Sequence, residues 1–262
     1  MTPEADHLDA ATRLDDAASH HRSIPPLGES LGAAPYEVQQ AAVTRRARRL
    51  GSRPVGYKVA LTSPAAQAAL GTSEPATGRL LAVDVLPSGA TVDLDVMFAP
   101  VLEAELVFRV REDLPMGASA AQIAEGCDVA AGLECPDSRY ADWFGGDFPR
   151  LPLSDVIADN CLVGLIVVAD TWLPADAVDL PAVTARLLVE GEQVATGRGT
   201  EVLGDPLRSV AWLSGRLAVA GESLPAGTYV SAGTLTPPLV VRPGEWRCVF
   251  SAGLGDVSVR FR

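Results

Sequence analysis

From residue 55 onward, the sequence is a succession of short apolar runs rich in valine and leucine, and each run soon ends at glycine, proline or aspartate. Runs of this length, broken by turn-forming residues, are typical of β-strands joined by tight connections. The main body of the chain is therefore expected to be β-rich. We expect strands at 56–61, 101–110, 129–134, 161–169, 186–189, 229–232, 246–251 and 257–261, with a hairpin turn at 190–192.

Helical signals dominate only the beginning of the chain. An acidic, alanine-rich opening is followed by a Pro25-Pro26 break and by a second segment that begins at Pro35 and ends in arginines, which suit a helix C-terminus. One further helix interrupts the strands, with Asp205 as its N-cap and Gly221 closing it. Residues 1–54 are thus predicted to form an N-terminal helical region and residues 55–262 a β-rich domain, which would hold any catalytic site.

The composition argues against nucleic acids and membranes as partners, and against secretion. The net charge of -12 and the pI of about 4.7 repel nucleic-acid phosphates and anionic membrane surfaces. No apolar stretch reaches the roughly 20 residues that span a bilayer, and the opening lacks the basic and apolar segments of a secretion signal. We therefore expect a cytoplasmic protein that binds neither nucleic acid nor membrane.

Histidine, lysine and cysteine are unevenly used. All three histidines precede residue 22, which makes Ser-His-Asp triads and histidine-ligated zinc improbable in the body of the chain: His7, His20 and His21. Lys58 is the only lysine, so it is either there by chance or it serves as a compact charge with an adjustable pKa. The cysteines have no C-x-x-C pairing and are expected to be buried free thiols: Cys127, Cys135, Cys161 and Cys248.

Two glutamates stand in the strand expected at 101–110, V-L-E-A-E-L-V-F-R-V. Side chains alternate along a strand, so Glu103 and Glu105 point to the same face, with their Cα atoms about 7 Å apart. On a helix the same spacing would turn them about 200° from each other. The pair either forms the solvated face of an amphipathic strand or requires a positive charge between its carboxylates.

Glu134 ends a second strand, V-A-A-G-L-E, and can supply a third carboxylate. Three carboxylates without a histidine are the ligands of a hard cation, and Mg²⁺ or Mn²⁺ would keep water ligands that a substrate oxygen can replace.

A series of motifs then occurs in the order of a known family. They are G-Y-K-V-A-L-T-S (56–63), A-A-L-G-T-S-E-P-A-T-G-R-L-L (68–81), P-V-L-E-A-E-L-V-F (100–108), G-L-E-C-P-D-S-R-Y-A-D-W (132–143), I-A-D-N (157–160), G-R-G-T-E-V-L-G-D-P-L (197–207), A-G-T-L-T-P-P (232–238) and L-G-D-V-S-V-R-F (254–261). Together they resemble the 2-keto-4-pentenoate hydratase and 4-oxalocrotonate decarboxylase family of the fumarylacetoacetate hydrolase superfamily.

This resemblance implies an α+β fold: a mixed β-roll or sandwich of the fumarylacetoacetate hydrolase C-terminal type with a small helical N-terminal region, usually oligomeric. It implies Mg²⁺ or Mn²⁺ at the positions that match Glu103, Glu105 and Glu134, with Lys58 as the active-site lysine. The metal would chelate the 2-oxo and carboxylate groups of the substrate and stabilise an enolate. Segments that border the substrate match Leu61, Thr234 and Leu235.

The sequence departs from the family pattern at two positions. Ala76 stands where the family's P-D-F-G motif has its aspartate, and Leu162 stands where A-D-N-A-S has its serine. Both replaced groups are expected to position water or relay protons, so the pocket is predicted to enolise its substrate and to add water poorly.

Three functional hypotheses follow. The first is a metal-dependent lyase, a hydratase or decarboxylase of a small 2-oxo or 2-hydroxydienoate acid, acting as a homo-oligomer or paired with a related pathway enzyme. The second is a repurposed enzyme that isomerises, decarboxylates or cyclises such a substrate without hydrating it. The third is a non-catalytic partner subunit, against which the retained carboxylates argue.

Three further polar residues follow the second strand or precede the strand expected at 161–169. Asp137 and Arg139 either contact the Glu134 carboxylate and orient it toward its ligand, or form an exposed ion pair. Asp159 is expected to accept hydrogen bonds from backbone amides at a turn rather than to act as an acid or base.

Overall fold

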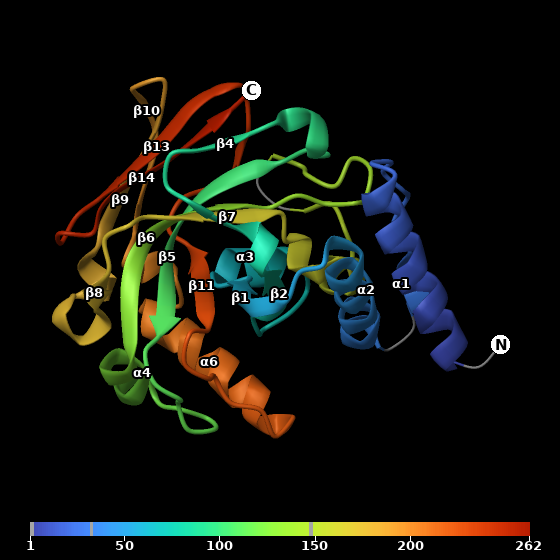
Figure 1. The fold of residues 1–262 in the computed structure, drawn as a ribbon, viewed down its shortest axis with the longest axis horizontal. Helices are drawn as coiled ribbons and strands as arrows, with labels where there is room; N and C mark the ends of the chain where they lie inside the picture. The colour runs from blue at the N-terminus through green and yellow to red at the C-terminus, as the bar shows by residue number, and fades with distance from the viewer. Residues whose placement is uncertain (1–2, 32–33, 147–148) are drawn as a thin grey trace.

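Two mixed β-sheets share one hydrophobic core in the computed structural model, which describes residues 3–31, 34–146 and 149–262 (Figure 1). The strands of the larger sheet are β1 (Pro54–Ala60), β2 (Ala76–Leu81), β3 (Val85–Pro87), β5 (Val101–Val110), β6 (Cys127–Cys135), β7 (Leu165–Val168), β8 (Leu173–Pro174), β11 (Tyr229–Thr234) and β12 (Leu239–Val240). The smaller sheet contains β4 (Ala90–Val92), β9 (Thr184–Val189), β10 (Glu192–Arg198), β13 (Gly244–Phe250) and β14 (Gly255–Phe261).

The strand order decides which side chains can meet. The main path of the larger sheet is β2-β1-β11-β5-β6-β7-β3, and that of the smaller sheet is β10-β9-β13-β14-β4. Strands β1 and β11 are parallel, whereas β5 runs antiparallel to both of its neighbours, β11 and β6. The middle of the larger sheet therefore places β1, β11, β5 and β6 side by side, although they lie far apart in the sequence.

The apolar face of β5 builds the core, as its period of two predicts. One set of alternating side chains is completely or almost completely buried and belongs to the same core cluster as residues of β13 and β14: Leu102, Ala104, Leu106, Phe108 and Val110. All four cysteines are buried and free, which confirms the expectation for the thiols.

The described helices are α1 (Pro3–Ser19), α2 (Pro35–Leu50), α3 (Pro64–Ala69), α4 (Ala120–Gly126), α5 (Leu153–Ala158) and α6 (Pro206–Val219). Helices α1 and α2 pack together beside the sheets (Figure 1), and their apolar residues form one cluster with Val101, Trp143 and Leu162. Asp205 caps α6 by accepting a hydrogen bond from the backbone N–H of Leu207, as predicted. None of the helices that the structure describes is long and apolar enough to cross a membrane.

Two sequence predictions of local structure are wrong. Short helices α3, α4 and α5 also interrupt the strands, and serine N-caps start the first two of them, Ser63 and Ser119. The strand expected at 161–169 begins only at Leu165, because Asn160, Cys161 and Leu162 all adopt positive φ angles of 57°, 50° and 62°. The Asn160 side chain holds this left-handed turn against β2 by bonding both the N–H and the C=O of Arg79.

The architecture is α+β, with mixed sheets and a helical beginning, and it confirms the predicted fold class. The division of the chain between residues 54 and 55 stays a prediction.

Candidate metal and substrate site

Strand register brings three carboxylates together on one face of the larger sheet. Glu103 lies directly opposite Glu134 in the β5–β6 pair, and Glu105 follows Glu103 by two residues on β5. Opposite residues of antiparallel strands have their Cβ atoms about 5 Å apart, so side chains on this face must converge. One carboxylate oxygen from each of the three glutamates lies within 4.8 Å of the others.

The Glu105 carboxylate is fixed from the neighbouring strand β11. The Ser231 hydroxyl donates to its Oε2 atom, and the Gly233 backbone N–H donates to the same atom at 3.0 Å. Because both donors use Oε2, no hydrogen bond among the described residues occupies Oε1, which can serve as a ligand atom.

Sequence reasoning did not single out Ser231 or Gly233. Alternation along β11 puts both on the same side of that strand, but only the pairing of β11 with β5 shows that this side faces Glu105. Gly233 is also required sterically: its φ is 115°, and a Cβ atom there would lie 2.2 Å from Thr62 Oγ1.

Lys58 reaches the carboxylates from strand β1. Its Nζ atom donates to Glu134 Oε2 at 2.9 Å, and both side chains are buried. The second oxygen of Glu134, Oε1, is buried without a hydrogen-bond partner in the described part of the chain. An unpaired buried carboxylate oxygen costs free energy and is otherwise rare, so it points to a ligand that the protein chain does not supply.

The electrostatics of the cluster favour an added cation. Burial, followed by repulsion from Glu134 and Glu105, raises the pKa of Glu103 well above its usual value. Burial also raises the pKa of Glu134 to about 7, although the Lys58 ammonium opposes this shift. Burial alone would lower the pKa of Lys58, but attraction to the three carboxylates outweighs it and the net shift is upward.

With all four groups ionised, the three carboxylates and the ammonium carry a net charge of minus two in a largely desolvated site. One divalent cation would neutralise that charge. The oxygen-only donors, the shared 4.8 Å sphere and the unpaired Glu134 oxygen all fit Mg²⁺ or Mn²⁺.

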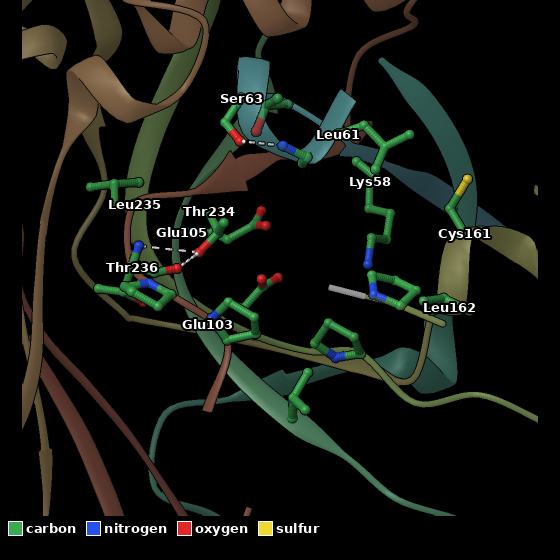
Figure 2. Close-up of a pocket in the computed structure, with 18 of the residues that line it drawn as sticks. Lys58, Leu61, Ser63, Glu103, Glu105, Cys161, Leu162, Thr234, Leu235 and Thr236 are labelled. Atoms are coloured by element: carbon green, nitrogen blue, oxygen red, sulfur yellow. Dashed lines mark hydrogen bonds between the residues drawn. The ribbon is translucent and has the colours of Figure 1, made fainter. Parts of the chain in front are cut away.

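A cavity of about 530 Å³ opens over this cluster (Figure 2). Four of the five residues predicted to contact substrate line it: Leu61, Leu162, Thr234 and Leu235. Ala76 does not. It lies on β2 opposite Ala60 and packs behind the cavity wall with Cys161 and Ile157, so the methyl at this position faces the protein interior.

Leu61 adopts a left-handed conformation at the cavity edge, with φ of 60°. Its carbonyl accepts a hydrogen bond of 2.9 Å from the Gln67 side chain on α3, and the next carbonyl, that of Thr62, accepts one from the N–H of Leu203. These two bonds fix a strained backbone directly after the strand that carries Lys58.

The three polar residues downstream of β6 hold loops rather than Glu134. The Asp137 carboxylate accepts hydrogen bonds from the backbone N–H groups of Phe98 and Ala99, each at 2.9 Å. Arg139 pairs with Asp159, which also accepts from the Ser138 hydroxyl and the Arg139 backbone N–H. Asp159 thus accepts from one backbone amide, as expected at a turn, and its other partners are side chains. The interpretation of Asp137 and Arg139 as an exposed ion pair is wrong, since Asp137 is buried and Arg139 binds another carboxylate.

No family model matches the chain, but individual proteins do. It is 33% identical over 267 aligned positions to a 2-keto-4-pentenoate hydratase of Paraburkholderia xenovorans, covering 100% of this chain and 96% of that protein. It is 32% identical over 259 positions to a 4-oxalocrotonate decarboxylase of Pseudomonas putida, covering 98% of this chain and 95% of the relative.

Solved structures of related proteins have the same fold as this chain. The 4-oxalocrotonate decarboxylase from Pseudomonas putida G7, complexed with magnesium and adipate, superimposes with a TM-score of 0.90 at 30% identity over 100% of this chain and 99% of its own. Fumarylpyruvate hydrolase from Pseudomonas aeruginosa, in complex with Mn²⁺ and pyruvate, shares the fold at a TM-score of 0.56 and 21% identity, over 80% and 89% of the two chains.

Proposed function

The chain belongs to the family of 2-keto-4-pentenoate hydratases and 4-oxalocrotonate decarboxylases, within the fumarylacetoacetate hydrolase superfamily, and we propose that it is a divalent-metal-dependent lyase. Its substrate is a small 2-oxo or 2-hydroxydienoate acid. The observation that carries this proposal is the convergence of Glu103, Glu105 and Glu134 beside the buried Lys58, at a cavity that Lys58, Glu103 and Glu105 line.

Glu103, Glu105 and Glu134 would hold Mg²⁺ or Mn²⁺, the ions found with the two structural relatives. When bound, such an ion supplies positive charge that polarises the 2-oxo and carboxylate oxygens of the substrate. The chain itself orients the ligands. Ser231 and Gly233 fix one oxygen of Glu105, and Lys58 fixes one oxygen of Glu134.

Lys58 is the residue that we propose to move a proton. Its Nζ atom lies among the carboxylates and lines the cavity, and no histidine, arginine or second lysine lines the described part of that cavity. We assign it the donation of a proton to the substrate carbon skeleton, or the binding of the substrate carboxylate; both need an ammonium at this place. The oxygen of Glu134 that accepts from Lys58 restrains the ammonium in either role.

A second outcome of the same chemistry is supported by Leu162. Its side chain is buried and lines the cavity at the position where the family resemblance leads one to expect a serine. Without that hydroxyl, the described wall offers an attacking water one hydrogen-bonding group fewer. Enolisation that ends in ketonisation, decarboxylation or ring closure, without hydration, is therefore the alternative to the hydratase reaction.

One experiment separates these functions. The protein is incubated with Mg²⁺ and 2-hydroxypenta-2,4-dienoate, the dienol absorbance is followed, and the product is identified by mass spectrometry. Loss of absorbance with a product heavier by one water supports a hydratase, and loss with an unchanged mass supports ketonisation. Failure of this dienoate and of its 5-carboxylated analogue to react, with no Mg²⁺ or Mn²⁺ bound, would refute the lyase and favour a non-catalytic partner subunit.

A further inference from the structure

Beyond the carboxylate cluster, one side of the cavity wall is apolar. Val101, Trp143 and Val156 line it and belong to the buried cluster that also contains Leu162. Phe144 lines the cavity beside Trp143, with the two ring centroids 5.3 Å apart. A cavity of about 530 Å³ lies in the range of sites for ligands much larger than a five-carbon acid. Most of the space is therefore left for a substrate tail.

Few charged residues line this cavity, and most of them are anionic. Among the described residues that line the cavity, only Lys58 is cationic, and its ammonium is already paired with Glu134. The anionic lining residues are Glu103 and Glu105 in the cluster and Glu201. Glu201 is exposed, forms no ion pair among the described residues, and so brings an uncompensated negative charge to the cavity.

We infer that the substrate carries a single carboxylate, at its 2-oxo end, and an apolar tail that lies against Val101, Trp143, Phe144 and Val156. Glu201 is then a specificity residue that disfavours a second, terminal carboxylate. This inference rests on the proposed function, because it takes the 2-oxo acid end to lie at the carboxylate cluster. A terminal carboxylate would lose water against apolar side chains, would find no free cation, and would be repelled by Glu201. An alkyl or aryl tail would instead gain from burial.

The test uses the full-length protein loaded with Mn²⁺, and measures the binding of unreactive 2-oxo acids by calorimetry. The matched pair is 2-oxohexanoate and 2-oxohexanedioate, which differ only in a terminal methyl or carboxylate. We expect the diacid to bind about tenfold more weakly or worse, and 2-oxo-4-phenylbutanoate to bind about tenfold more tightly than pyruvate. Equal or tighter binding of the diacid would overturn the inference.

Oxalate and pyruvate serve as the control for the underlying function, since they have the chelating end and no tail. If they bind and the diacid is preferred, the proposed lyase stands and only the apolar-tail inference is wrong. If Mn²⁺-loaded protein binds neither oxalate nor pyruvate, the proposed function is refuted, and the inference that rests on it is refuted as well.

Two variants test the charge argument directly. Thr196 lines the cavity and is exposed on β10, so Thr196→Arg adds a cation there without entering the core; Glu201→Gln removes the anion. Each should reduce the preference for the monoacid by about threefold or more at low salt. Gln193→Arg, on the same strand but away from the cavity lining, is the matched control and should leave the ratio unchanged. An unaltered ratio in both cavity variants would overturn the assignment of Glu201.

Discussion

Replacing Glu103 by glutamine should have opposite effects on the metal-free and the metal-loaded protein. One carboxylate oxygen from each of the three glutamates lies within 4.8 Å of the others. At an effective dielectric constant of 20, each ionised pair at that distance repels by about 3 kcal/mol. Glu103 faces two such partners and Lys58 offsets part of the repulsion, so Glu103→Gln should stabilise the metal-free protein by about 1–3 kcal/mol at pH 8.

In the presence of Mn²⁺, the wild-type protein should instead be more stable than the Glu103→Gln variant. Wild-type protein gains about 4.1 kcal/mol when free metal is a thousand times its Kd, which exceeds the advantage of about 1–3 kcal/mol expected for the metal-free variant. The variant has lost one of three anionic ligands and should gain little. Thermal unfolding measured with EDTA and with MnCl₂ gives both numbers, and each kcal/mol corresponds to about 2–4 °C for a chain of this size.

The pH dependence has a defined sign. The folded-state pKa of Glu103 and of Glu134 is raised, to about 7 for Glu134, so the folded metal-free protein binds protons more tightly than the unfolded chain. Its stability should therefore fall as the pH rises from about 5 to 8, and the advantage of Glu103→Gln should grow over the same interval.

Glu192→Gln is the matched control, because it makes the same charge change on an exposed residue at the start of β10. It should alter neither the metal-free stability nor the response to Mn²⁺. If Glu103→Gln behaves like this control in both conditions, Glu103 belongs only to the solvated face of a strand, and the electrostatic reasoning is refuted.

Three further substitutions probe the site. Lys58→Met should lower kcat by about 10²-fold or more while Mn²⁺ affinity, measured by calorimetry, is unchanged or higher because a positive charge has been removed; retained turnover would exclude Lys58 from proton transfer. Leu162→Ser should raise the ratio of hydrated to ketonised product, measured by NMR, and an unchanged ratio would dismiss the missing hydroxyl as the cause. Gly233→Ala should destabilise the metal-free protein by about 2 kcal/mol and weaken Mn²⁺ binding, since its Cβ would clash with Thr62 and displace the N–H that holds Glu105; normal denaturation and titration curves would contradict this.

Local patterns predicted much of the scaffold. Strand β5 has the bounds expected from its sequence, Val101–Val110, because ten residues with a buried alternating face leave little choice of register or length. Alternation alone placed Glu103 and Glu105 on one face, and helix α6 follows from its Asp205-Pro206 start.

Long-range pairing could not be obtained in this way. That Glu103 faces Glu134, and that Ser231 reaches Glu105, depends on which strands become neighbours, and the residues involved are separated by up to 126 positions. The left-handed turn at Asn160 was also missed, since its apolar residues read as the start of a strand and its stabilising bonds go to Arg79 on β2. Ala76 is a further example. Sequence similarity predicted that this residue contacts the substrate, but only its packing shows that it lies behind the cavity wall.

A crystal structure with Mn²⁺, phased to reveal the anomalous signal of the metal, is the most direct test of the proposed centre. One peak should lie between Glu103, Glu105 and Glu134, at about 2.1 Å from an oxygen of each, with Lys58 still paired to the second oxygen of Glu134. If no peak lies between these carboxylates at saturating Mn²⁺, or if the peak lies elsewhere on the chain, the assignment of the metal site is wrong. The lyase chemistry that depends on it is then contradicted as well.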